Sequence, residues 1–110
     1  LDTTNRPEAI FVANDAMALV VMDVLRHEAG LKVPADIAIV GYDDTPPAQW
    51  PSYDLTSFSQ PADEMVENTV HLLIHHMNEN DTEPLQITVS GQLKIRSSSK
   101  NIKKVSDARV

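Results

Sequence analysis

The sequence predicts an α/β fold in which a mainly parallel sheet is flanked by helices. Two short, continuously apolar segments, residues 9–13 and 37–41, have the composition of strands that are buried on both faces. A helical pattern lies between them, and the whole stretch has the length of a strand–helix–strand unit, about 30 residues. The crossover of such a unit is expected to be right-handed. Three prolines then mark residues 43–54 as a loop.

The helix between the two strands is expected to begin at Asn14 or Asp15. Either side chain can accept a backbone N–H bond of the first helical turn. Gly30 suits the left-handed residue that commonly ends a helix. The apolar positions that trace this helix are Met17, Val20, Val21, Val24 and Leu25.

The second half of the chain predicts a third strand at residues 55–59 and a helix that begins near Pro61. Proline suits the first turn of a helix because its fixed φ is already helical. This second helix has a long apolar stripe, formed by Ala62, Val66, Val70, Leu73 and Met77. Few strands remain for the stripe to cover, so part of its partner sheet is expected to lie outside this chain.

The remaining residues predict a polar turn at 78–83 and strands at 85–89 and 93–95. From Ser97 onward the chain is polar, and its end is expected to be frayed. The chain has no cysteine, which excludes disulfides and suits the reducing cytoplasm. No apolar run is long enough to span a membrane.

Two polar pairs follow the two predicted buried strands directly. Asn14-Asp15 comes after the first strand, and Asp43-Asp44 comes after the second. Parallel strands bring their carboxyl ends to one edge of the sheet, where ligands bind in α/β folds. An amide beside a carboxylate suits hydroxyl or ring N–H groups. The alternative is that the first pair only caps a helix and the second only forms a solvated turn.

Four segments resemble motifs of the LacI/GalR repressors, and they occur in the family's order and spacing. Residues 11–18 (FVANDAMA) are similar to an "AND-x-MA" motif, and residues 33–44 (VPADIAIVGYDD) to "VP-x-DI-x-VVGYDD". Residues 55–61 (LTSFSQP) resemble an "LT-T-x-x-QP" crossover, and residues 95–99 (IRSSS) a terminal "V-R-x-S-T". Together they cover nearly the whole chain.

The resemblance implies a partial type I periplasmic-binding-protein-like fold, in which two α/β subdomains enclose a ligand. Residues 1–60 and a final strand at 92–99 would belong to the C-terminal effector subdomain. Residues 61–91 would be a piece of the N-terminal effector subdomain, and residues 100–110 a polar tail. This assignment accounts for the helix that lacks a sheet.

The resemblance also implies two groups of functional residues. The effector would contact Asn14, Asp43 and Gln60. A dimer interface would include Leu19, Pro47 and Trp50, although a lone tryptophan in a proline-rich loop could also fill the core. The family's arginine and aromatic pocket residues lie upstream of this sequence.

The expected function is the small-molecule sensing core of a cytoplasmic LacI-type repressor that forms a homodimer or higher oligomer. The net charge of −7 disfavours nucleic-acid binding by the chain itself. DNA would be bound only through a helix-turn-helix headpiece that this chain lacks. A periplasmic sugar-binding protein of a transporter is the alternative, and an enzyme is not expected.

No cofactor, catalytic residue or metal site is predicted. His71 and His75 are four residues apart and could place two imidazoles on one helix face, but no third ligand is evident. An exposed, pH-responsive face is favoured over a metal site. Asp43 and Asp44 could also suggest a phosphoryl or Mg²⁺ site, but the lysine and hydroxyl partners of such a site are not found.

Overall fold

The computed structural model describes residues 5–79 and 84–100 of the chain. The chain divides into two compact units. One contains the described residues up to Ser59 and from Leu93 onward, and the other is Gln60–Gln92. Most of the turn predicted at 78–83, and all of the tail after Lys100, lie outside the described residues.

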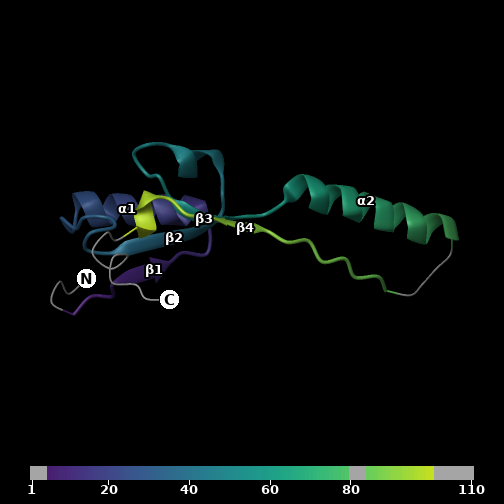
Figure 1. Ribbon diagram of the computed structural model, residues 1–110, viewed down its shortest axis with the longest axis horizontal. Coiled ribbons are helices and arrows are strands. Elements are labelled where there is room, and N and C mark those ends of the chain that lie inside the picture. The colour runs from purple at the N-terminus through teal and green to yellow at the C-terminus, as the bar shows by residue number, and fades with distance from the viewer. Residues whose placement is uncertain (1–4, 80–83, 101–110) are drawn as a thin grey trace. The chain divides into compact units, whose positions relative to one another are not determined.

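The sheet of the first unit has its four strands in the order β1-β2-β3-β4 (Figure 1). The strands are β1 (Ala9–Phe11), β2 (Ala38–Asp43), β3 (Thr56–Ser59) and β4 (Gln92–Lys94). The central strand β2 runs parallel to both β1 and β3, with Val40 opposite Phe11 on one side and Thr56 on the other. The predicted α/β class with a mainly parallel sheet is therefore confirmed.

Helix α1 (Asp15–His27) connects β1 to β2, and Ala18, Met22 and Leu25 are its buried apolar residues. They belong to one core cluster with Val12, Leu31, Ile37, Ile39, Ala48 and Leu55. Gly30 has a φ of +67°, the left-handed conformation expected after the helix.

The prediction of which face of α1 is buried is wrong, because the helix is rotated about its axis relative to the predicted orientation. Met17, Val20 and Val24 are 55%, 61% and 43% exposed, whereas Leu25 alone of the predicted stripe is fully buried. The face that packs toward the sheet instead carries Met22 and the buried carboxylate of Asp15. That face carries both the apolar core residues of the helix and the anchored carboxylate.

The first strand is not buried on both faces as predicted. Phe11 is 65% exposed and Ala9 is also exposed. β1 is an edge strand of the described sheet, with β2 beside it on one side. In β2, buried Ile39 and Gly41 alternate with half-buried Ala38 and Val40, which shows that within the described residues one face is covered more fully than the other.

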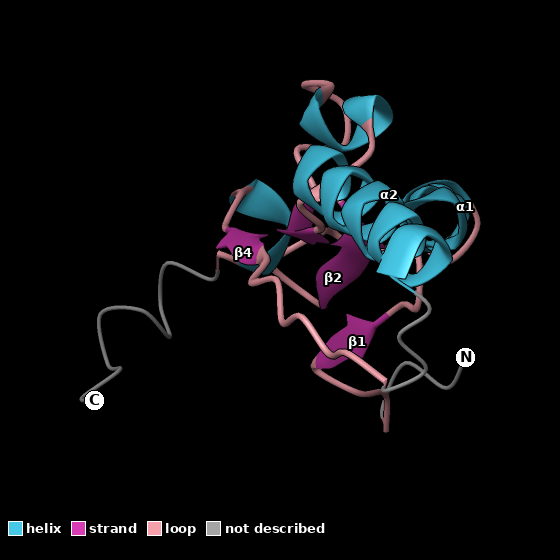
Figure 2. Cartoon of the chain, turned by 90° about the vertical axis from the view of Figure 1, so that its right-hand side faces the viewer, coloured by secondary structure: helices cyan, strands magenta, loops and turns pink. Residues whose placement is uncertain are grey.

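The second unit contains α2 (Ala62–Glu79) and an extended segment that returns alongside it. The stripe of α2 is open to solvent, with Val66 62% and Met77 74% exposed. Residues 85–89 form no strand, contrary to the prediction (Figure 2). A strand needs a neighbouring ladder of backbone hydrogen bonds, and in the described residues this segment faces a helix instead.

Within the described residues, 5–79 and 84–100, no helix is both long and apolar enough to cross a membrane.

Candidate functional site at the carboxyl edge of the sheet

The carboxyl ends of β1, β2 and β3 carry the polar residues singled out from the sequence. Asn14 follows β1, and Asp43 is the last residue of β2. Because β1 and β2 are parallel neighbours, these two residues stand at the same edge of the sheet. Asp43 is opposite Ser59, the last residue of β3, and Gln60 follows as the first residue of the second unit.

Asn14 is the N-cap of α1. Its backbone is extended, and its Oδ1 accepts a hydrogen bond from the backbone N–H of Met17 at 2.9 Å. Asn14 therefore caps the helix, as expected, and the cap occupies the oxygen of its amide. The cap uses the oxygen, so the amide nitrogen is the group with which Asn14 can donate to a ligand.

Asp15 is fully buried and joins three segments of the chain. Its Oδ1 accepts from the hydroxyl of Ser57 at 2.6 Å. Its Oδ2 accepts from the backbone N–H and the hydroxyl of Thr45, at 2.7 and 3.2 Å. All three partners donate, which suits a carboxylate, an acceptor-only group when it is ionised.

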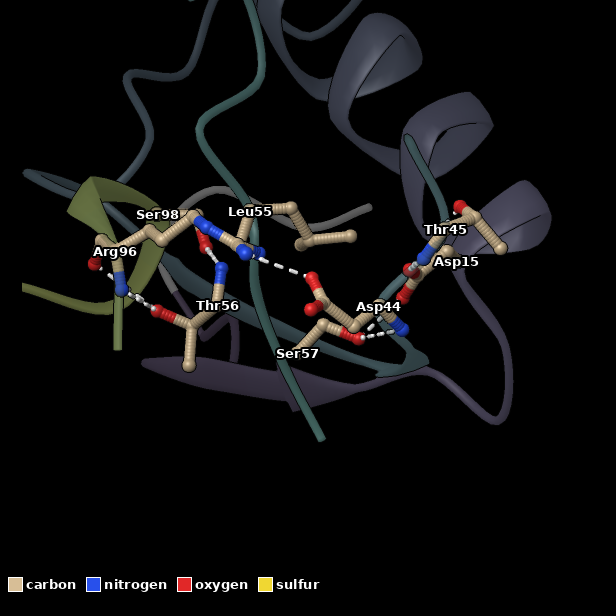
Figure 3. A network of polar contacts seen from close by, with 8 residues as sticks. All are labelled: Asp15, Asp44, Thr45, Leu55, Thr56, Ser57, Arg96 and Ser98. Atoms are coloured by element: carbon tan, nitrogen blue, oxygen red, sulfur yellow. Dashed lines mark hydrogen bonds and ion pairs between the residues drawn. The ribbon is translucent and has the colours of Figure 1, made fainter. Parts of the chain in front are cut away.

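The loop that follows β2 has an unusual backbone. Asp43 and Asp44 have φ values of 119° and 55°, in the region that favours glycine. The N–H of Asp44 donates to the Ser57 hydroxyl at 2.9 Å, and its carboxylate lies 2.7 Å from the guanidinium of Arg96 (Figure 3). Asp44 is thus held by contacts to Ser57 and Arg96, and the simple solvated-turn alternative is wrong for this residue.

The segment after β4 is anchored to the sheet, contrary to the frayed end predicted from Ser97. Ser98 is buried, and its hydroxyl donates to the carbonyl of Ile39 at 2.6 Å and accepts from the N–H of Thr56 at 2.8 Å. Arg96 donates from its side chain to the carbonyl of Leu55 at 2.7 Å (Figure 3). The local sequence is polar and resembles a frayed end, because the residues that anchor it lie far away in the sequence.

The residues predicted for a dimer interface differ in exposure. Trp50 is 55% exposed, and its ring centre lies 6.4 Å from that of Tyr53. Pro47, in the short 3-10 helix Pro46–Gln49, is half-buried. Leu19 is half-buried and packs against the core. The more exposed apolar surface of α1 is its stripe of Met17, Val20 and Val24.

Side-chain contacts hold the segment of residues 50–54, called the Trp50 loop, against α1. The hydroxyl of Tyr53 donates to Asp23 at 3.1 Å, and this hydrogen bond raises the pKa of Tyr53. Arg26 donates to the carbonyl of Ser52. The loop and the helix therefore form one continuous surface.

On α2, the imidazole of His71 lies 3.9 Å from Glu67, a contact between neighbouring helical turns on an exposed surface. In the part of the chain that the structure describes, no three His, Asp or Glu side chains gather closely enough to hold a metal ion.

The connection of Asp15, Ser57 and Arg96 into one group was not predicted from the sequence. One signal was present: Asp15 falls on the same helical stripe as Ala18 and Met22, at intervals of three and four residues. A carboxylate on a buried stripe requires hydrogen-bond partners. The partners themselves lie 30 and 42 residues away, and nothing in the local pattern identifies them.

Comparison with known proteins gives consistent matches. Residues 1–99 match the family model described as a periplasmic binding protein-like domain. The ribose operon repressor of Escherichia coli K12 is 45% identical over 74 residues, which are 67% of this chain and 22% of that protein.

Two solved structures resemble this chain closely. The complex of the transcriptional regulator CelR with cellobiose has a TM-score of 0.78 and 36% identity, over 84% of this chain and 28% of the other. A LacI family regulator of Lactobacillus casei with bound sucrose has a TM-score of 0.75 and 37% identity, over 90% and 36%. The chain thus spans between about a fifth and somewhat more than a third of the length of these proteins.

Proposed function

We infer the function of this chain from the fact that it belongs to the family of periplasmic binding protein-like domains, in the form found in LacI/GalR-type transcriptional regulators. It is part of the sensing core of such a repressor, and its effector is a sugar or a related metabolite. The single observation that carries this proposal is the placement of Asn14 and Asp43 at one edge of a parallel sheet.

The chemistry of that edge suits a polyol. The amide nitrogen of Asn14 donates, and the carboxylate of Asp43 accepts. A sugar hydroxyl can do both, so two such groups at one edge of the sheet can recognise hydroxyls of one sugar. Gln60, directly after β3, adds a second amide to the proposed contacts. Two similar structures, those of CelR and of the Lactobacillus casei regulator, hold cellobiose and sucrose.

The two units of the chain fit the two subdomains of the family's fold. We assign residues 1–60, with the final strand at 92–99, to the C-terminal effector subdomain. Residues 61–91 are a piece of the N-terminal effector subdomain, and residues 100–110 a tail. The division of the chain after Ser59 and again before Leu93 supports this assignment.

The protein acts as a homodimer or higher oligomer in this proposal. The surface formed by α1 and the Trp50 loop supplies the interface, with Leu19, Pro47 and Trp50 among its residues. Exposed aromatic and apolar side chains are enriched in interface cores. The exposure of Trp50 and of the α1 stripe of Met17, Val20 and Val24 supports this choice of surface.

DNA is bound in the cytoplasm through a headpiece outside this chain, and effector binding changes the relative placement of two such headpieces. The net charge of −7 gives the chain itself little affinity for phosphates. We assign it no enzymatic activity and no cofactor. A transporter's periplasmic sugar-binding protein is the weaker alternative, because the relatives named above are regulators.

A mobility-shift assay tests the proposal. The complete protein that contains this chain is mixed with the promoter DNA of its own gene, and ribose, cellobiose or sucrose is added. At least one sugar is expected to change the fraction of DNA bound, and the 110-residue chain alone is expected to bind no DNA sequence selectively. Sequence-selective binding by the chain alone, or a protein without any DNA affinity, would contradict the proposal.

A further inference from the structure

The proposed effector carboxylate of Asp43 stands on a strained backbone. Asp43 and Asp44 both have positive φ values, 119° and 55°, although neither is a glycine. L-residues avoid this region because Cβ crowds the backbone, so such a conformation persists only where the surroundings enforce it. The residues that enforce it therefore also determine where Asp43 points.

Hydrogen bonds and an ion pair reach this loop from three separate segments. Thr45 donates its N–H to Asp15 at the start of α1. Asp44 donates its N–H to Ser57 on β3, and its carboxylate pairs with Arg96 after β4. Two of the three converge, because the hydroxyl of Ser57 itself donates to Asp15 (Figure 3).

Asp15 is the centre of this arrangement. It is fully buried, both of its oxygens accept, and it is adjacent in sequence to Asn14. One carboxylate thus connects the helix start that presents Asn14 to the loop that presents Asp43. A Cβ on Gly41 would lie only 2.5 Å from its Oδ1, so the neighbouring strand also leaves room for this side chain.

We propose that Asp15 is a positioning residue: it binds no effector itself but fixes the left-handed loop and so sets the spacing between Asn14 and Asp43. This inference rests on the proposed function for the meaning of that spacing. The brace itself can be tested without any effector.

Amide hydrogen exchange of the ¹⁵N-labelled 110-residue chain tests the brace. In Asp15→Ala, the amides of Thr45 and Asp44 should exchange at least about tenfold faster relative to that of Met22, because local opening then precedes global unfolding. Asp36→Ala is the matched control. Asp36 accepts the backbone N–H of Lys32 at 2.8 Å and pairs with Arg6 at 3.6 Å before β2 begins, at the opposite edge of the sheet, so the amides of Thr45 and Asp44 should not respond.

Asp15→Asn keeps the side-chain volume and serves if the alanine variant does not fold. It should accelerate the same two amides, because one acceptor is replaced by a donor. The proposal is overturned if the loop amides accelerate no more than that of Met22, if Asp36→Ala accelerates them equally, or if neither Asp15 variant folds. A failure to find any sugar that binds would instead count against the proposed function and leave this result standing.

Discussion

The hydroxyl of Ser98 lies 2.6 Å from the carbonyl oxygen of Ile39, a residue 59 positions earlier in the chain. The same hydroxyl accepts the N–H of Thr56, so one buried side chain joins β2, β3 and the segment after β4. The serine thus accepts from a backbone donor of β3 and donates to a backbone acceptor of β2.

Ser98→Ala should lower the free energy of unfolding by about 1–3 kcal/mol, because it leaves a buried N–H and a buried carbonyl without this partner. Urea denaturation measures the loss. Ser52→Ala is the control, since Ser52 is exposed and the structure uses its backbone carbonyl. Equal effects of the two substitutions would show that the Ser98 bond contributes no stability of its own.

Gly41→Ala should destabilise the chain for a steric reason. The new methyl group would lie 2.5 Å from Oδ1 of Asp15 and 3.0 Å from Cδ2 of Leu55. Overpacking of this kind costs about 1–3 kcal/mol. Gly30→Asn is the comparison, since a Cβ at Gly30 meets no atom within 4 Å and asparagine tolerates a positive φ. An unfolding midpoint unchanged by Gly41→Ala would contradict the close packing around Asp15.

The predicted sheet, its parallel order and the cap at Asn14 follow from local patterns: apolar runs, turn residues and a polar residue before a helix. The rotation of α1 could not be predicted because both of its faces carry apolar residues. Ser57, which anchors the buried carboxylate of Asp15 on this helix, lies 42 residues away in the sequence. The burial of Ser98 was missed for the same reason.

Residues 85–89 show a different error: their local pattern is that of a strand, but in the described residues they pair with no other strand. Their alternation suits a strand, yet strand pairing is a property of two segments. The same holds for the candidate site. The polar residues at the strand ends were predicted from the sequence, but the buried residues that hold them in place were not.

Asp54 should make stability depend on acid pH. Hydrogen bonds from Ser97 hold the pKa of Asp54 below its ordinary value of 3.8. A lowered folded-state pKa stabilises the fold above pH 3.8, and that contribution is lost as the pH falls through the folded-state value. The unfolding free energies of wild type and Asp54→Asn should therefore differ at pH 6 and converge toward pH 2. A difference that grows on acidification would reverse the assigned sign.

Asn14→Asp separates the capping role of Asn14 from its proposed ligand role. Aspartate still supplies an oxygen to the N–H of Met17, and it suits the start of a helix, so thermal stability should be retained. The variant has no amide donor, so sugar affinity should fall by about tenfold, the worth of one hydrogen bond near 1.4 kcal/mol. Unchanged affinity in a titration would mean that Asn14 is only a cap.

The proposed effector site depends on the carboxylate of Asp43. Isothermal titration of the complete protein with the sugar found in the mobility-shift assay would compare wild type, Asp43→Asn and the control Asp36→Asn. Loss of a charged acceptor costs about 1.5–3 kcal/mol, which raises Kd by roughly ten- to hundredfold in Asp43→Asn alone. A Kd that Asp43→Asn leaves at the wild-type value would contradict the assignment of the effector site to this edge of the sheet.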